Sequence, residues 1–124
     1  MNVLFVDDDE VTLFLYQMLV KNFPDMQPFY AKDGQEAINL LKSGQAIDVV
    51  FTDLNMPVLD GFALLSEHDR LPIHQQAQGI FVMLGTSISD DKKSQVLQYA
   101  SVKDALPKPL TVDLFKQACL QIAG

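Results

Sequence analysis

The sequence has a single cysteine, Cys119, and only two histidines, His68 and His74, among its 124 residues. One thiol cannot form an internal disulfide, and the chain has no Cys/His cluster with the spacing of a zinc site. Both histidines are near a polar loop and are expected to be solvated, while Cys119 is expected to be a small buried hydrophobe. A reducing compartment, the cytoplasm, is the expected location.

Basic residues are scarce: nine Lys and Arg stand against 16 Asp and Glu, which gives a formal net charge of −7. This charge repels nucleic-acid phosphates and anionic lipids, so we expect no direct nucleic-acid partner and no membrane partner. The N-terminus lacks the basic region of a signal peptide. The longest uncharged run, 71–89, is interrupted by Pro72, His74 and Gly79 and should not span a bilayer.

The composition is that of a globular protein, with 48% hydrophobic and 20% charged residues. A chain of this length is expected to form one compact domain over residues 1–124, with a core large enough to fold alone. There is no internal repeat and no low-complexity tract.

Apolar runs alternate with amphipathic ones along the chain. Strands are predicted at 3–6, 29–31, 48–52, 80–84 and 103–106. Helices are predicted at about 10–23, 35–43, from about 62, at 89–99 and at 112–122. Five strand–helix pairs of this kind predict an α/β fold with a parallel sheet covered by helices on both faces.

In such sheets, ligands bind beyond the carboxyl ends of the strands. Acidic residues follow two of the predicted strands: Asp7 and Asp8 come after the first, and Asp53 comes after the third. Two carboxylates about 4 Å apart repel each other by roughly 4 kcal/mol at an effective dielectric near 20, so a cation is expected between them. Mg²⁺ suits an all-oxygen site of this kind, whereas the lack of Cys and His disfavours zinc.

The other strand ends add groups that suit phosphoryl chemistry. Lys108 follows the last strand, and Thr86 and Ser87 follow the fourth. A carboxylate beside Mg²⁺ and an ammonium group can attack phosphorus to form an aspartyl phosphate. Lys108 would neutralise charge on the phosphoryl oxygens, and Thr86 or Ser87 would donate a hydrogen bond to one of them.

These motifs resemble the receiver (CheY-like) domain of bacterial two-component response regulators. The segments that carry the resemblance are VDDDE, FTDLNMPVLDG and LPKPL, in order and over the whole chain. The resemblance implies a flavodoxin-like (βα)5 three-layer sandwich with strand order 2-1-3-4-5.

The family pattern also implies a role for individual residues. Asp53 matches the phosphoacceptor, Asp7 and Asp8 match the acidic pair that binds Mg²⁺, and the backbone carbonyl of Asn55 matches a further metal ligand. Lys108 matches the family's lysine, and the peptide bond to Pro109 is expected to be cis.

Two positions depart from the family pattern. The hydroxyl after the fourth strand is assigned to Thr86, with Ser87 as the substitute. Three residues before Lys108, many receivers have Tyr or Phe, whose inward rotation reports phosphorylation, but this chain has Ala105. The signal would therefore pass through the backbone of the fourth helix and the loop before it, or through another side chain.

The first predicted helix is apolar almost all round. Its solvent side is assigned to the arc that contains Gln17 and Lys21. That assignment exposes Leu13, Phe14 and Met18, either as scattered surface residues or as a docking patch for a partner helix.

The predicted function is a phosphorylation-dependent switch, not an enzyme beyond assisting its own phosphorylation and dephosphorylation. Its partners would be a sensor histidine kinase or a histidine phosphotransfer protein and a downstream target, with a phosphorylation-linked dimer as a further expectation. One alternative is a degenerate receiver that binds partners without phosphate. Another is a haloacid-dehalogenase-type phosphatase, which needs a second Asp where Asn55 stands and a cap domain that 124 residues do not accommodate.

Overall fold

The computed structural model describes residues 1–85 and 90–123. The five strands are β1 (Asn2–Val6), β2 (Gln27–Ala31), β3 (Val49–Asp53), β4 (Gly79–Leu84) and β5 (Val102–Pro107). The helices are α1 (Glu10–Val20), α2 (Gly34–Lys42), α3 (Gly61–Arg70), α4 (Asp90–Leu97) and α5 (Val112–Ala123), with a short 3₁₀ helix, η1 (Ile73–Gln75). No helix in the described part of the chain is long and apolar enough to cross a membrane.

The strands form one parallel sheet in the order β2-β1-β3-β4-β5. This order confirms the predicted flavodoxin-like fold. It makes β1 and β3 neighbours, so that Asp7, which follows β1, and Asp53, the last residue of β3, lie side by side at the carboxyl end of the sheet.

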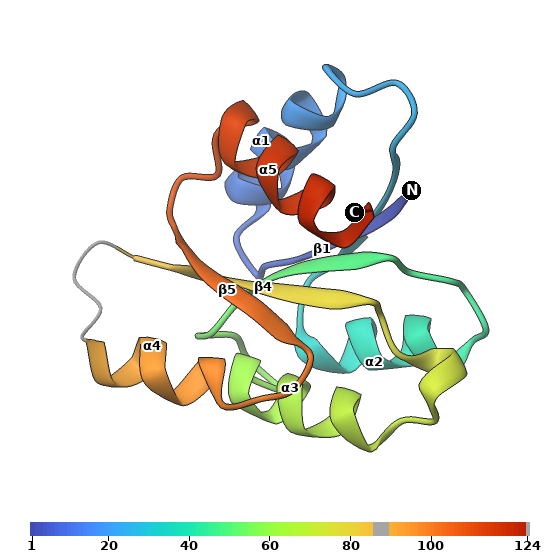
Figure 1. The fold of residues 1–124 in the computed structure, drawn as a ribbon, viewed down its shortest axis with the longest axis vertical. Helices are drawn as coiled ribbons and strands as arrows, with labels where there is room; N and C mark the ends of the chain where they lie inside the picture. The colour runs from blue at the N-terminus through green and yellow to red at the C-terminus, as the bar shows by residue number, and fades with distance from the viewer. Residues whose placement is uncertain (86–89, 124) are drawn as a thin grey trace.

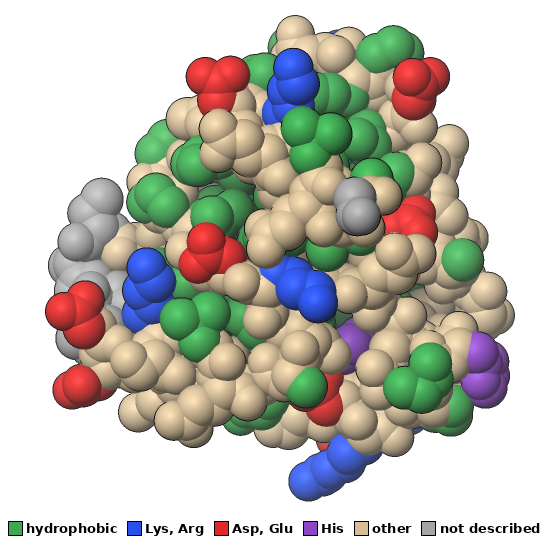
Figure 2. Space-filling model, in the orientation of Figure 1, with side chains coloured by type: hydrophobic (Ala, Val, Ile, Leu, Met, Phe, Trp, Pro, Cys, Tyr) green, Lys and Arg blue, Asp and Glu red, His purple; other side chains and the backbone are tan. Residues whose placement is uncertain are grey.

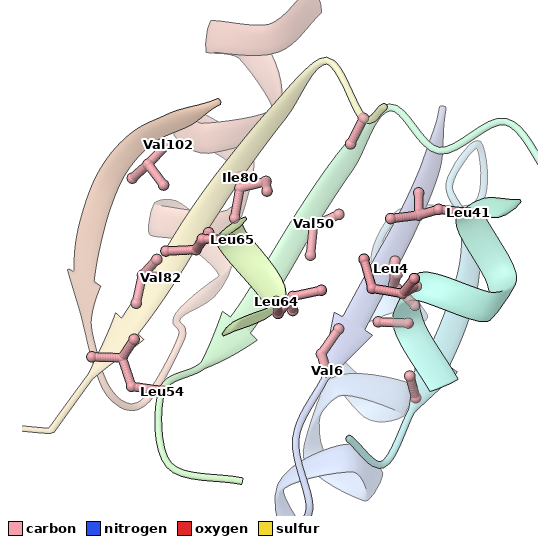
Figure 3. Close-up of a cluster of buried hydrophobic side chains, with 14 of the residues drawn as sticks. Leu4, Val6, Leu41, Val50, Leu54, Leu64, Leu65, Ile80, Val82 and Val102 are labelled. Carbon is pink, nitrogen blue, oxygen red and sulfur yellow. The ribbon is translucent and has the colours of Figure 1, made fainter. Parts of the chain in front are cut away.

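Helices cover both faces of the sheet. Figure 1 shows α1 and α5 on one side and α2, α3 and α4 on the other. The two interfaces contain separate hydrophobic clusters. Figure 3 shows the cluster under α2 and α3, where Leu64 and Leu65 of α3 meet Val50 and Ile80 of the central strands.

The pleat of the strands decides which side chains point toward α1 and α5. In β1, Val3 and Phe5 pack into the α1/α5 cluster, whereas Leu4 and Val6 pack into the opposite one. The same alternation puts Phe51 of β3 on the α1/α5 side. Because side chains alternate with a period of two, Asp7 and Asp53 continue these rows on the α1/α5 side of the sheet.

Three helices begin at an aspartate that caps their free N–H groups. The carboxylates of Asp9, Asp33 and Asp60 accept hydrogen bonds from the backbone N–H groups of Val11, Glu36 and Ala63. An aspartate at this position stabilises a helix start by about 1 kcal/mol. Because α1, α2 and α3 follow β1, β2 and β3 in the chain, their capped first turns lie at the carboxyl-end side of the sheet.

The prediction that the first helix continues to Phe23 was wrong. Regular helix ends at Val20, and the N–H groups of Asn22 and Phe23 instead donate to the carbonyls of Leu19 and Val20, three residues back. Such tightening is common in the last turn of a helix, and Pro24 follows immediately.

The expectation that His68 is solvated was also wrong. Its side chain is fully buried on α3, whereas His74 is exposed as predicted. Both ring nitrogens of His68 are hydrogen-bonded: Nε2 accepts from the Ala77 N–H at 2.9 Å, so Nδ1 carries the proton and donates to Asp69 Oδ1 at 2.9 Å. The sequence around His68 is polar, but these contacts allow the ring to be buried.

Cys119 is buried in α5, as predicted. Burial raises the pKa of its thiol to about 11, so the thiolate that would react or bind metal is scarce at neutral pH. The residue is a small core hydrophobe.

Candidate metal and phosphoryl site

Three acidic side chains meet at the carboxyl end of the sheet. One oxygen each of Asp7, Asp8 and Asp53 lies within 4.8 Å of the other two. Asp7 is buried, Asp8 is exposed and Asp53 is intermediate. Such a cluster could be approached from solvent through the Asp8 side.

Asp7 is the buried member, with 1% of its surface exposed. Its Oδ1 accepts a hydrogen bond from the Asp9 N–H at 2.9 Å. Its Oδ2 is buried and, among the residues that the structure describes, has no hydrogen-bond partner. A buried carboxylate oxygen without a partner costs free energy, which is a reason to look for a cation there.

The surroundings raise the pKa of the Asp7 carboxyl above its ordinary value of 3.8. Burial is the largest cause, and the negative charges of Asp53 and Asp8 act in the same direction. The Asp9 N–H and the Lys108 ammonium oppose the rise. Burial and the neighbouring carboxylates therefore both disfavour the charged form of Asp7, and a bound divalent cation would favour it.

Lys108 supplies the fixed positive charge of the site. Its Nζ lies 3.1 Å from Asp53 Oδ1 and 3.8 Å from Asp7 Oδ2. The Leu54 N–H donates to Asp53 Oδ1 at 2.8 Å. Because both contacts fall on the same oxygen, they fix the Asp53 carboxylate in one orientation.

The residues present fit Mg²⁺. The donor set is made of carboxylate oxygens, which Mg²⁺ prefers. Asp7 Oδ2, which has no hydrogen-bond partner among the described residues, lies 3.8 Å from the Lys108 Nζ that also contacts Asp53. Lys108 neutralises only part of the charge of three carboxylates. The geometry therefore supports the predicted magnesium site and gives no support to zinc.

A family model described as the response regulator receiver domain matches residues 3–119. The chain belongs to this family. Receiver domains are signalling domains of two-component systems and bind Mg²⁺ at the acidic pocket.

Two curated relatives show how differently receivers are used. The chain is 30% identical over 112 residues to the two-component response regulator ARR22 of Arabidopsis thaliana, covering 89% of this chain and 75% of that one. It is 33% identical over 87 residues to the sensor histidine kinase RcsC of Salmonella typhimurium, covering 70% of this chain but only 8% of the kinase.

Solved receiver structures share the fold. The receiver domain of sensor histidine kinase PA1611 from Pseudomonas aeruginosa, which holds a magnesium ion in its active-site cleft, has a TM-score of 0.84 at 20% identity, covering 99% of this chain and 98% of that one. A response regulator receiver protein from Dyadobacter fermentans has a TM-score of 0.84 at 24% identity over the same shares.

The remaining predictions for this site concern Asn55, the peptide bond before Pro109, and the hydroxyl groups of Thr86 and Ser87. Asn55 is exposed in the loop between β3 and α3, two residues after Asp53. The Lys108–Pro109 peptide bond is cis. Thr86 and Ser87 lie outside the described residues, so their hydroxyl role stays a prediction.

The exposed face of α1 differs from the predicted one. Phe14 and Met18 are exposed, at 56% and 45%, but Leu13 is buried, and Leu15, which is not among the residues predicted to be exposed, is 55% exposed. The buried face of α1 is made of Leu13, Tyr16, Leu19 and Val20. With apolar residues on both arcs, the sequence pattern could not fix which face is buried.

The receiver also has a groove that sequence reasoning missed. It has a volume of about 480 Å³ and runs between α1 and the segment from Lys108 to Val112. Leu15, Tyr16 and Met18 line its α1 side. In the view of Figure 2, hydrophobic side chains gather over the half of the molecule that α1 and α5 occupy.

Tyr16 forms the wall between this groove and the core. Its ring stacks on Phe5 with centroids 4.6 Å apart. Burial and the nearby charges of Asp7 and Asp53 raise the pKa of its hydroxyl, which therefore stays protonated at neutral pH. The sequence does not predict that Tyr16 lies near Asp7 and Asp53, because the distance between them depends on how α1 packs beside the strand ends.

Proposed function

We propose that this receiver accepts a phosphoryl group on Asp53, with Mg²⁺ held by the carboxylates of Asp7, Asp8 and Asp53 and by the backbone carbonyl of Asn55. The observation that supports this most strongly is the buried Asp7 Oδ2, which has no hydrogen-bond partner among the described residues, beside Asp53 and Lys108. Lys108 contacts both Asp7 and Asp53, and of these two Asp53 is the one that is partly open to solvent and so accessible to a phosphodonor.

In the proposed reaction, an oxygen of the Asp53 carboxylate attacks the phosphorus of a phosphohistidine. The new O–P bond forms as the P–N bond breaks, and the electron pair leaves with the imidazole nitrogen, which takes up a proton. Bound Mg²⁺ would supply positive charge against the phosphoryl oxygens. No general base is needed, because the nucleophile is an ionised carboxylate.

Lys108 would stabilise the product. Its ammonium lies 3.1 Å from Asp53, and the side chain is about one-third exposed, so the ammonium can shift to contact the negatively charged oxygens of a phosphoryl group on Asp53. Thr86 or Ser87 would donate a hydrogen bond to another phosphoryl oxygen. Ala105 is buried in β5 and cannot act as an aromatic reporter, so the signal would pass through the backbone of α4 and the loop before it, or through another side chain.

The phosphodonor would be a sensor histidine kinase or a histidine phosphotransfer protein, and the output would be a downstream target protein or a phosphorylation-linked dimer. Phe14 and Met18 would contact the donor, together with Leu15, which the structure adds to the exposed face. We retain a cytoplasmic location and a single receiver over residues 1–124 as predictions.

The test is intact mass spectrometry of the purified chain incubated with Mg²⁺ and acetyl phosphate. We expect the wild type to gain one phosphoryl group, and the gain to be lost in Asp53→Asn and in the presence of a chelator. Asp60→Asn is the matched control, because Asp60 caps α3 and is outside the acidic cluster. An unmodified wild type would instead favour the degenerate receiver that acts without phosphate.

A phosphatase of the haloacid-dehalogenase type is a weaker alternative. It would need a second acid two residues after Asp53, where the chain has Asn55. The same labelling experiment separates the two, because steady hydrolysis of many equivalents of acetyl phosphate is the result expected of a phosphatase.

A further inference from the structure

The loop between β3 and α3, residues 54–60, joins the proposed phosphoacceptor to the helix that follows it. Asn55, whose carbonyl we assign to Mg²⁺, lies in this loop between two buried residues, Leu54 and Met56. The position of that carbonyl therefore depends on what holds the loop in shape.

Part of the loop has a backbone conformation that its sequence disfavours. Val58 has a φ of 66°, and the Leu59 N–H donates to the Pro57 carbonyl at 2.7 Å, which closes a tight turn around it. A β-branched residue rarely adopts positive φ, and strain of this kind persists only where the surroundings impose it. The 81%-exposed side chain of Val58 does not provide such a restraint.

A restraint comes from α2, whose first residue, Gly34, lies 25 residues before Leu59 in the sequence. The N–H of Gly34, the first residue of α2, donates to the Leu59 carbonyl at 3.0 Å. A Cβ added to Gly34 would lie 2.5 Å from that carbonyl oxygen and 3.1 Å from the Leu59 Cβ. The contact joins two backbones, so neither side can yield by a change of rotamer, and only glycine fits.

The start of α2 is itself held firmly. Asp33 accepts from the Glu36 N–H at 2.8 Å, and Glu36 Oε1 accepts from the Lys32 N–H at 2.8 Å. These reciprocal bonds resemble a capping box and fix the first turn. A loop carbonyl bound to this turn is therefore bound to a rigid part of the fold.

We propose that Gly34 is a positioning residue for the magnesium site, because it holds Leu59 and thereby fixes the loop that carries Asn55. This inference rests on the proposed function. It connects the site to α2, an element that supplies none of the metal ligands.

The first test compares Mg²⁺ affinity, measured by calorimetric titration, in wild type, Gly34→Ala and Gly44→Ala. Gly44 has a φ of 93° and no atom within 4 Å of an added Cβ, so Gly44→Ala strains the backbone away from the loop and serves as the matched control. We expect Gly34→Ala to bind Mg²⁺ about tenfold more weakly and Gly44→Ala to bind as the wild type does.

Equal Mg²⁺ affinity in Gly34→Ala and wild type would overturn the inference, and so would an equal loss in both glycine variants. A wild type that does not bind Mg²⁺ would instead overturn the proposed function on which the inference rests. These outcomes are distinguishable in one set of titrations.

A second measurement needs no variant and decides the matter if Gly34→Ala does not fold. Coupling between two sites is reciprocal, so Mg²⁺ must strengthen the Gly34–Leu59 contact if that contact strengthens Mg²⁺ binding. We expect Mg²⁺ to slow hydrogen exchange of the Gly34 amide several-fold more than that of the Ala37 amide, which bonds within α2 to the Asp33 carbonyl. Equal slowing of both amides would contradict the proposal.

Discussion

Asp7 and His68 are both titratable and almost fully buried, at 1% and 0% exposure, but their surroundings differ in kind. Each ring nitrogen of His68 has a hydrogen-bond partner. Asp69, which accepts from the ring, also accepts a hydrogen bond from the Ser101 hydroxyl at 2.6 Å. Asp7 has one hydrogen-bonded oxygen and one without a hydrogen-bond partner among the described residues, 3.8 Å from the Lys108 ammonium and beside two further carboxylates.

The difference separates a structural polar group from a binding one. The His68 network joins the end of α3 to the segment before β4 and to the turn before β5, so it stabilises the fold when nothing is bound. The Asp7 cluster contains a buried carboxylate oxygen without a hydrogen-bond partner among the described residues, which is unfavourable and which the proposed Mg²⁺ would relieve. Burial of a polar side chain alone therefore does not indicate a binding role. A buried polar atom without a hydrogen-bond partner does call for an explanation, such as a bound ion.

Removing the His68 ring should give the largest change in stability. We expect His68→Ala to lower the free energy of unfolding by about 3 kcal/mol, because it leaves a cavity and an unpaired Ala77 N–H. His74→Ala, which changes an exposed histidine, is the matched control. Urea denaturation measures both, and a loss of Mg²⁺ affinity in a folded His68→Ala variant would contradict the assignment of a purely structural role.

The opposite sign is expected at Asp7. Without Mg²⁺ at pH 7, Asp7→Asn should raise the free energy of unfolding by about 1 kcal/mol, because it removes a buried charge that lacks a full partner. The exposed Asp8 is the matched position, and Asp8→Asn should change stability less.

The pH dependence follows from the raised pKa of Asp7. The folded protein binds the Asp7 proton more tightly than the unfolded chain does. The charged Asp7 carboxylate therefore lowers the free energy of unfolding at neutral pH, and this loss disappears as the pH falls toward 3.8, the ordinary pKa of the group. The advantage of Asp7→Asn should shrink over this range. A D7N variant that is less stable than wild type at pH 7 without Mg²⁺ would contradict this account.

Lys108 should give a smaller effect of the same electrostatic origin. Lys108→Met removes the ammonium 3.1 Å from Asp53, and we expect a loss of about 0.5–1 kcal/mol, limited by the solvent screening of a side chain that is one-third exposed. Added Mg²⁺ should restore part of this stability. Lys103→Met, at an exposed lysine of β5, the strand that Lys108 follows, is the control, and equal losses in the two variants would show that the acidic cluster is not the cause.

The smallest stability change is expected on α1. Phe14→Glu should alter the free energy of unfolding by no more than about 0.5 kcal/mol, because the ring is 56% exposed. It should nevertheless slow transfer from a phosphorylated histidine phosphotransfer protein while leaving acetyl phosphate labelling intact. Ile73→Glu, at an exposed apolar residue of η1, is the control, and equal loss with both donors would argue against docking.

The strand ends could be predicted because the signals there are local. Short apolar runs fixed the strands to within about two residues, and the carboxyl-end rule then placed Asp7, Asp53 and Lys108 together. The sequence could not show which arc of α1 faces the core, because Leu13 and Leu15 are equally apolar and only packing distinguishes them. His68 was missed for a related reason: its partners Ala77 and Asp69 satisfy it through a chain reversal that has no local signature.

The most direct test of the central claim is a calorimetric titration of Mg²⁺ into wild type and Asp7→Asn at pH 7. If the partnerless Asp7 oxygen helps to hold the metal, wild type should bind one Mg²⁺, and Asp7→Asn should bind it at least about tenfold more weakly although the apo variant is the more stable protein. Equal affinity in the two proteins, or no binding by wild type, would contradict the account.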